Sequence, residues 1–377
     1  MGEDATSYLS AELREVLRCC ARDSHADGTV GQDSLKALRS SGLLAICVPT
    51  EHGGRGYDVA TANRVVEEVA TVNPSVAIML YLHCAVVTRI DAYGTEEQKR
   101  RWFDRITDGG WLAASAWSEA GGHADKRSLG TVARRWPDGS WRVTGGKTFS
   151  TSSTVADFFM VLAQLPEQES SGTTATAGYG RDNQLILLIT ADADGVRAPS
   201  DALPMIGMRG SGTGLIYFED TKVDAGDLLC EGAVTPQAIG LPHRLGLTLG
   251  AVSVGTAQAA LDLLLEHQHR RGLLDEAQAR HQVARLAVTT RAARAMVADL
   301  GAQAPYADAD AAYAVKVFAS TSALSVCTEV RTLLGSAGYL QHHDIARVSL
   351  DAEAVIHMGP PNHLCVDLIS RSLSGGR

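Results

Sequence analysis

The sequence has little of what marks several common classes of protein. It has no basic excess, because 34 Lys and Arg stand against 43 Asp and Glu, for a net charge of −9. Proteins that bind nucleic acid usually carry a basic face, so this balance argues against that function. No uninterrupted apolar run reaches the ~18–20 residues that span a bilayer, and the first residues show no signal-peptide pattern. We therefore expect neither a nucleic-acid nor a membrane partner.

Cysteine is also scarce. The seven cysteines are scattered among apolar neighbours, and no two of them form a C-x-x-C pair. An odd number without such spacing indicates buried thiols in a reducing compartment rather than disulfides or a zinc site. The sequence thus predicts a cytoplasmic protein without a bound metal.

What the sequence does contain is enough apolar residues for a large core, since 45% of its 377 residues are hydrophobic and 20% are charged. Apolar positions at three- and four-residue spacing predict helices at both ends of the chain. Between them, apolar runs bounded by turn residues predict strands, with a two-residue hairpin turn at Asp138-Gly139. This order predicts an α+β fold with an N-terminal α-helical domain (1–110), a central antiparallel β-domain (111–225) and a C-terminal α-helical bundle (226–377).

Individual elements follow from the same patterns. Two helix starts have local signals: Thr95 precedes acidic residues and Gln98, and Asp308 is a capping residue. The predicted helices are 9–21, 32–41, 61–72, 75–92, 96–107, 240–270, 277–302, 308–334 and 345–357. The predicted strands are 112–117, 131–136, 141–144, 157–162, 185–190 and 215–218.

The stretch from Trp111 to Val161 carries the strongest functional signal. Between its first two strands the turn from Ser118 to Asp125 reads Ser-Glu-Ala-Gly-Gly-His-Ala-Asp, and its two glycines allow the close approach of a planar ligand. Ser118 and Thr151 carry hydroxyls at the ends of two strands. We therefore expect these hydroxyls to contact one flat heterocycle.

These motifs resemble those of the acyl-CoA dehydrogenase superfamily. The turn is similar to the family's T-E-P-G-A-G-S-D, and residues 146–152 resemble G-x-K-x-W-I-T-N. The resemblance covers nearly the whole chain: residues 42–56, 93–99 and 206–211 resemble G-L-x-x-x-x-V-P-x-x-x-G-G-x-G, G-T-E-E-Q-K and G-M-R-G-S. It implies the family's fold and a flavin-dependent oxidoreductase that acts on an acyl thioester, carried by CoA or an acyl-carrier protein.

The resemblance also implies where FAD binds. Ser118 and Thr151 would contact the flavin ring, with Phe149 in place of the family's tryptophan. Arg271 would bind the pyrophosphate of a neighbouring subunit's FAD, because a guanidinium forms two parallel charge-assisted bonds. Gln282 and Gly335 match two further cofactor motifs. This arrangement implies a homodimer or a homotetramer.

The family's catalytic base is missing from both of its usual positions. The resemblance places one glutamate at Gly359 and the alternative near Leu245, and no Asp or Glu lies between residues 240 and 260. The candidate substitutes are His83, which interrupts an apolar helix, and His357, beside the lost glutamate. Glu353 lies more than a turn before Gly359, so we expect it to face elsewhere.

Three functions stay open on this evidence. The first is oxidation of an acyl thioester with an atypical or absent base. The second is a flavin-dependent monooxygenase of the same fold, served by a flavin reductase, because residues 147–153, His83 and residues 357–360 resemble those relatives. The third is a non-catalytic subunit of a heteromeric dehydrogenase, because Asp275, Thr332 and Gly359 all depart from the family motifs. A dehydrogenase would also need an electron-transfer partner.

Overall fold

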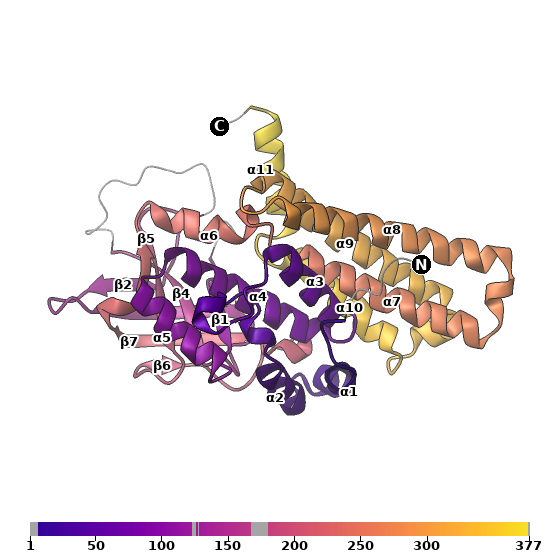
Figure 1. The fold of residues 1–377 in the computed structure, drawn as a ribbon, viewed down its shortest axis with the longest axis horizontal. Helices are drawn as coiled ribbons and strands as arrows, with labels where there is room; N and C mark the ends of the chain where they lie inside the picture. The colour runs from indigo at the N-terminus through magenta and orange to yellow at the C-terminus, as the bar shows by residue number, and fades with distance from the viewer. Residues whose placement is uncertain (1–6, 123–125, 127, 167–179, 376–377) are drawn as a thin grey trace.

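The chain folds into an N-terminal set of helices, a mixed β-sheet and a C-terminal bundle of long helices (Figure 1). The computed structural model describes residues 7–122, 126, 128–166 and 180–375. In Figure 1 the sheet lies at one end of the molecule and the long C-terminal helices extend to the other. The predicted α+β fold class is therefore confirmed.

The N-terminal helices begin where local capping signals stand. The Thr95 hydroxyl and the Gln98 side chain form a reciprocal capping box, which confirms the predicted helix start. Asn73 caps the start of helix α4 (Pro74–Tyr93), and Pro74 occupies the first turn of that helix, where no backbone donor is needed. The elements are α1 (Ala11–Asp27), α2 (Gln32–Ser40), η1 (Leu43–Ala45), η2 (Thr50–His52), α3 (Val59–Ala70), α4 (Pro74–Tyr93) and α5 (Glu96–Thr107).

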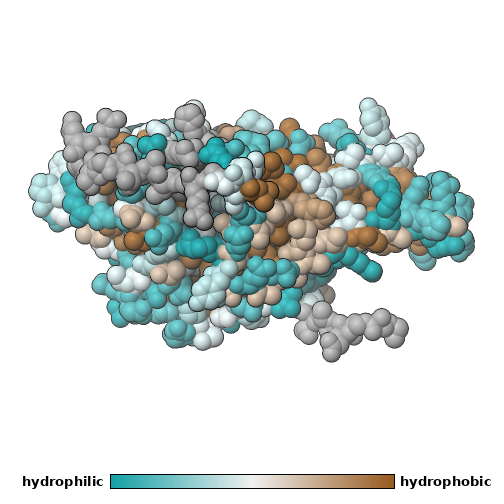
Figure 2. Space-filling model, turned by 90° about the horizontal axis from the view of Figure 1, so that it is seen from above, coloured by the Kyte–Doolittle hydropathy of each residue, from teal (hydrophilic) through white to brown (hydrophobic). Residues whose placement is uncertain are grey.

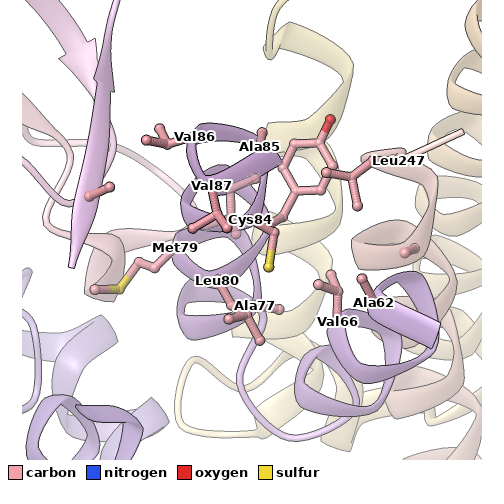
Figure 3. Close-up of a cluster of buried hydrophobic side chains, with 14 of the residues drawn as sticks. Ala62, Val66, Ala77, Met79, Leu80, Cys84, Ala85, Val86, Val87 and Leu247 are labelled. Atoms are coloured by element: carbon pink, nitrogen blue, oxygen red, sulfur yellow. The ribbon is translucent and has the colours of Figure 1, made fainter. Parts of the chain in front are cut away.

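Helix α4 is the central helix of the molecule. Figure 3 shows its side chains, among them Leu80, Cys84 and Val87, packed against Val66 of α3 and against Leu247. By length and composition alone α4 is apolar enough to cross a membrane, but 78% of its most apolar window is buried inside the protein. A helix that is hydrophobic all round is a core helix when neighbouring elements cover it in this way.

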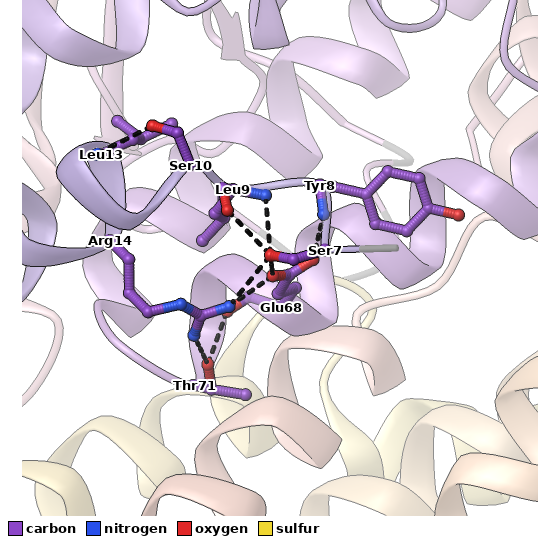
Figure 4. A network of polar contacts seen from close by, with 8 residues as sticks. All are labelled: Ser7, Tyr8, Leu9, Ser10, Leu13, Arg14, Glu68 and Thr71. Carbon is purple, nitrogen blue, oxygen red and sulfur yellow. Dashed lines mark hydrogen bonds and ion pairs between the residues drawn. The ribbon is translucent and has the colours of Figure 1, made fainter. Parts of the chain in front are cut away.

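A polar network fixes the start of the described chain (Figure 4). The Glu68 carboxylate accepts hydrogen bonds from the Tyr8 backbone N–H at 2.8 Å and from the Ser7 hydroxyl, and it pairs with the Arg14 guanidinium. Arg14 also reaches the Thr71 hydroxyl at 3.5 Å. These contacts hold α1 against α3.

The sheet has the strand order β6-β7-β3-β2-β4-β5-β8, with β1 beside β4. All pairings are antiparallel except those of β4 with β1 and with β2. The loop between β2 and β3 is longer than the predicted two-residue turn: the Trp136 N–H bonds the Ser140 carbonyl, and Gly139 has φ 85. The strands are β1 (Ala113–Ala116), β2 (Val132–Arg135), β3 (Trp141–Ser150), β4 (Phe158–Gln164), β5 (Gln184–Thr190), β6 (Val196–Arg197), β7 (Gly214–Val223) and β8 (Leu228–Glu231).

Both faces of the sheet are buried. Along β4, Phe158 and Met160 join the core shared with the N-terminal helices, whereas Phe159 and Val161 join a second cluster. Side chains from β1, β2, β3, β5 and β7 complete this second cluster, so the second face of the sheet is buried largely among the sheet's own side chains. The alternation is the two-residue period of a strand.

The C-terminal bundle differs from prediction in two places. The helix predicted over 240–270 is interrupted by Gly246, which has φ 74 and lies so close to Leu300 that an added Cβ would stand 2.4 Å from its carbonyl oxygen. The final helix was not predicted, whereas the start at Asp308 is confirmed as an N-cap. The helices are α6 (Val234–Arg244), α7 (Gly250–Arg270), α8 (Ala277–Ala302), α9 (Ala309–Leu333), α10 (Asp344–His357) and α11 (Asn362–Leu373).

The cysteines are all free thiols. Cys84, Cys230, Cys327 and Cys365 are buried, as predicted. Cys19 is exposed on α1, so the prediction of burial was wrong there.

Candidate functional site

A cavity of about 640 Å³ lies where the three parts of the chain meet. Its walls come from α4, from the ends of β1 and β3 and the residues after them, from the loop before β7, from α6 and from the second half of α10. The described lining residues are Ile78, Tyr81, Leu82, Ala85, Arg89, Ser115, Trp117, Ser118, Lys126, Phe149, Thr151, Met205, Ile206, Gly207, Met208, Thr213, Ile239, Pro242, His243, Leu249, Leu350, Glu353, Ala354, His357, Met358, Gly359 and Pro360.

Three of the residues predicted to contact a flavin lie together in this cavity. Ser118, Phe149 and Thr151 all line it. The Ser118 hydroxyl accepts a hydrogen bond from the Lys126 ammonium at 2.9 Å, and the Thr151 hydroxyl accepts one from Thr213 at 3.2 Å. Phe149 has a left-handed backbone, with φ 50, and its exposed fraction is 63%. Its ring therefore stands at the cavity rather than in the core.

The Glu119 carboxylate fixes the turn that begins at Ser118, next to this part of the cavity lining. It accepts hydrogen bonds from the backbone N–H groups of Gly130 at 2.5 Å and Thr131 at 3.0 Å, and Lys147 Nζ lies 2.6 Å from it. Burial lowers the pKa of Lys147 to about 8, although Glu119 opposes this effect. The ion pair joins the turn to β3. Residues 123–125, the rest of the predicted ligand-binding turn, lie outside the described residues.

His83 does not line the cavity, which does not fit its predicted catalytic role. It is fully buried, its Nδ1 accepts a hydrogen bond from the Ala113 backbone N–H at 3.0 Å, and its Nε2 lies 2.8 Å from the Leu44 carbonyl oxygen. An acceptor at Nδ1 places the ring proton on Nε2, which therefore donates to Leu44. Burial lowers the pKa of His83 to about 4, so the ring is neutral. His83 joins α4 to β1 and η1 through both ring nitrogens.

His357 lines the cavity, as a functional role would require, and so does Gly359. Glu353 lines it too, so the prediction that this carboxylate faces elsewhere was wrong. The two residues are one turn apart on α10, and His357 Nε2 lies 3.9 Å from Glu353 Oε1. Side chains four residues apart share a helix face, and this spacing was the available signal in the sequence.

Further ionisable residues of the cavity were not predicted, among them Arg89 and His243. The Arg89 guanidinium donates to the carbonyl oxygens of Ala238 and Ile239 at 2.7 and 2.8 Å, which ties α4 to α6. His243 lies on α6 and packs edge-on against the Tyr313 ring, with 5.2 Å between centroids. Burial, with Arg89, Lys316 and Arg244 nearby, lowers the pKa of His243 to about 4.

The other predicted cofactor residues lie away from the cavity. Arg271 is exposed at the end of α7, Gln282 is on α8, and Gly335 follows α9 with φ 61. All three belong to the end of the bundle where α7, α8 and α9 share a separate hydrophobic cluster. In one chain this end does not reach the cavity, so their contact with a neighbour's FAD stays a prediction.

Comparison with known proteins gives a consistent result along the chain. Family models described as the N-terminal, middle and C-terminal domains of acyl-CoA dehydrogenase match residues 3–110, 114–221 and 243–373. The probable acyl-CoA dehydrogenase FadE25 of Mycobacterium tuberculosis is 28% identical, over 96% of this chain and 94% of its own length.

Solved structures of the same fold also match nearly the whole chain. Butyryl-CoA dehydrogenase from Megasphaera elsdenii has a TM-score of 0.83 at 22% identity, covering 99% of this chain and 100% of its own. KijD3, in complex with FMN and a dTDP-amino sugar, has a TM-score of 0.84 at 24% identity, covering 97% and 92%. At these identities the structural similarity establishes the fold.

Proposed function

Because the chain belongs to the acyl-CoA dehydrogenase family, we propose that it is a flavin-dependent oxidoreductase that acts on an acyl thioester of CoA or of an acyl-carrier protein. The cavity is the observation that carries this proposal. One part of its lining offers hydroxyls and an exposed aromatic ring, and another offers apolar side chains such as Ile78, Leu82 and Leu249. A site with this division suits a flat polar ring beside an acyl chain.

The residues present fit FAD, the cofactor that the family uses. The hydroxyls of Ser118 and Thr151 suit the polar edge of an isoalloxazine, and Phe149 suits its face. When bound, the flavin supplies the redox chemistry, while the protein supplies orientation and electrostatics. Arg271, Gln282 and Gly335 would hold the rest of the cofactor of a second copy.

Proton handling falls to Glu353 and His357 in this proposal. Among the described lining residues Glu353 is the one carboxylate, and at 3.9 Å from His357 Nε2 it can stabilise the protonated imidazole as an ion pair. His357 would then accept or deliver a proton at the reacting end of the thioester. Since Gly359 offers no side chain for this purpose, proton abstraction from a saturated acyl chain should be slow.

Spectroscopy of the purified protein tests the function directly. We expect a yellow protein with one FAD per chain. Its flavin should be bleached under anaerobic conditions by an acyl-CoA or by an acyl-carrier protein that carries an acyl group. A protein that purifies without flavin and gains none on reconstitution would contradict the proposal. It would favour a non-catalytic partner subunit instead.

A flavin-dependent monooxygenase is the second candidate. It is favoured by the cavity itself, where imidazoles of His243 and His357 line the wall and Gly359 stands in the expected place of the glutamate. Such an enzyme would receive its flavin reduced by a separate reductase. Mixing the reduced protein with O₂ separates the two functions, because a flavin hydroperoxide spectrum is expected of the monooxygenase alone.

A homodimer or homotetramer in the cytoplasm completes the proposal. Figure 2 shows hydrophobic residues gathered near the middle of one face, between more hydrophilic ends. Large apolar side chains are exposed on the C-terminal helices, with exposed fractions of 65% for Val288, 39% for Phe318 and 51% for Val366. Exposed apolar surface of this kind often marks contact with another protein. Sedimentation as a monomer at micromolar concentration would contradict the oligomer.

A further inference from the structure

Lys316 is a buried cation that the proposed mechanism does not use. It lies on α9 with an exposed fraction of 3%. Its ammonium donates to the carbonyl oxygens of Met358 and Pro360 at 3.1 and 2.9 Å and to Asn362 Oδ1 at 2.7 Å. An ammonium has three N–H donors, so these acceptors use all of them.

The acceptors of Lys316 are neutral. Among the described residues no carboxylate lies within 4.0 Å of its ammonium, the limit for an ion pair. Burying a charge without an opposite charge is costly, and proteins usually pair such groups. Burial lowers the pKa of Lys316 to about 8. A lysine retained at such cost, beside a cavity, is a candidate for a functional role.

Lys316 fixes a segment of the chain that forms part of the cavity lining. Met358, Gly359 and Pro360 line the cavity directly after α10, and two of the three give their carbonyl oxygens to Lys316. Asn362, the next acceptor, is itself fixed by donating to the Ser320 hydroxyl at 2.9 Å. Lys316 and Ser320 are one turn apart on α9, so one helix anchors the whole segment.

We propose that Lys316 is the positioning residue of the thioester site: its ammonium fixes the segment 358–360. The cavity then holds the acyl thioester at a defined distance from the wall formed by Ser118, Phe149 and Thr151, here called the flavin wall. This inference rests on the proposed function. A displacement of about 1 Å at such a wall is enough to change binding or rate by roughly 10²-fold.

The groups around Lys316 predict how this anchor responds to pH. His243 of α6 and Cys365 of α11 are its ionisable neighbours, and Cys365 also donates to the Pro360 carbonyl at 3.3 Å. When the ammonium loses a proton, two N–H donors remain for three acceptors. The segment should then loosen, and substrate affinity should fall reversibly as the pH rises through about 8.

The test compares thioester binding by the FAD-loaded full-length protein and its variants. Octanoyl-CoA and octanoyl-acyl-carrier protein serve as probes in anaerobic titration calorimetry. Lys316→Met should weaken binding at least ~10-fold with an unchanged FAD content, and Lys316→Arg should restore part of the affinity because it keeps charged donors. Lys222→Met, at a side chain that is 50% exposed on β7, is the matched control and should bind normally.

The wild type provides a second measurement if Lys316→Met does not fold. Its affinity should fall between pH 7 and 9.5, whereas Lys316→Arg should bind equally at both pH values, because a guanidinium keeps its proton. Equal affinity of Lys316→Met and wild type, or a flat wild-type profile, would overturn the inference while leaving the proposed function intact. A wild type that binds neither probe would overturn the proposed function itself.

Discussion

Lys147 Nζ lies 2.6 Å from Glu119 Oε1, and both side chains are almost entirely buried, with side-chain exposures of 0% and 8%. This ion pair connects the turn that follows β1 to the strand that leads to Phe149 and Thr151. It therefore sets the relative position of the hydroxyls on the flavin wall, although neither charge lines the cavity.

Removing one member of this pair should destabilise the protein strongly. Lys147→Met leaves the Glu119 carboxylate buried without its cation, and breaking a buried pair in this way typically costs about 3–5 kcal/mol. Urea unfolding should show a lower free energy, and FAD should dissociate more readily. Lys147→Met combined with Glu119→Gln should recover part of the loss, because no charge is then left unpaired and the amide oxygen can still accept a backbone hydrogen bond of this turn. A double variant as unstable as the sum of both single variants would contradict this account.

The buried His83 should make stability depend on pH. Its folded pKa of about 4 lies below the ordinary histidine value of 6.5, so the unfolded chain binds the proton more readily. Stability from His83 is then fully present above pH 6.5 and is lost as the pH falls towards 4. The loss at pH 4 should be on the order of 3 kcal/mol.

Urea unfolding at several pH values between 7.5 and 4.5 measures this effect. His83→Asn should lower stability at neutral pH, because it removes hydrogen bonds to Leu44 and Ala113, and it should flatten the acid dependence. His342→Asn, at an exposed position, is the control and should keep the wild-type slope. An unchanged slope in His83→Asn would show that other groups set the acid limit.

Features that depend on neighbouring residues could be predicted from the sequence. The helix starts at Thr95 and Asp308 were predictable because a cap and its partners lie within three residues of each other. The wall of Ser118, Phe149 and Thr151 was reached through motif resemblance, and the structure brings the three side chains into one cavity.

The remaining errors come from contacts between distant segments. Nothing near His83 in the sequence reveals that Leu44 and Ala113 occupy both ring nitrogens. The break at Gly246 depends on its packing against Leu300. In the sequence Lys316 is one polar residue of an apolar helix, and its role depends on contacts with residues 358–362, which are distant in the chain.

The Glu353–His357 pair should control proton transfer. His357→Gln removes the proposed acid or base and should slow anaerobic flavin bleaching by roughly 10²-fold. Glu353→Gln removes only the carboxylate that stabilises the protonated imidazole, so a smaller loss of about 10-fold is expected. Neither variant should change urea stability much, since both side chains are substantially exposed, at 71% and 40%. Wild-type bleaching rates in both variants would exclude the pair from the mechanism.

The empty position at Gly359 offers the converse experiment, in which a base is added. Gly359 lines the cavity, and its backbone φ is outside the left-handed region, so a residue with a side chain meets no left-handed strain there. The nearby Lys316 ammonium, bonded to the carbonyl oxygens on either side of Gly359, would lower the pKa of an added carboxyl and keep it ionised.

Gly359→Glu should therefore accelerate bleaching by octanoyl-CoA, because general-base catalysis typically contributes ~10²–10⁴-fold when the base is well placed. Gly359→Gln is the matched control, since it adds the same bulk without a carboxylate and should remain as slow as the wild type. Both variants should retain FAD, which the visible spectrum reports. If Gly359→Glu and Gly359→Gln bleach at the same rate, the segment 358–360 does not face the α-carbon of the substrate. The proton would then leave towards another wall of the cavity. Among the described lining residues, His243 is the imidazole other than His357.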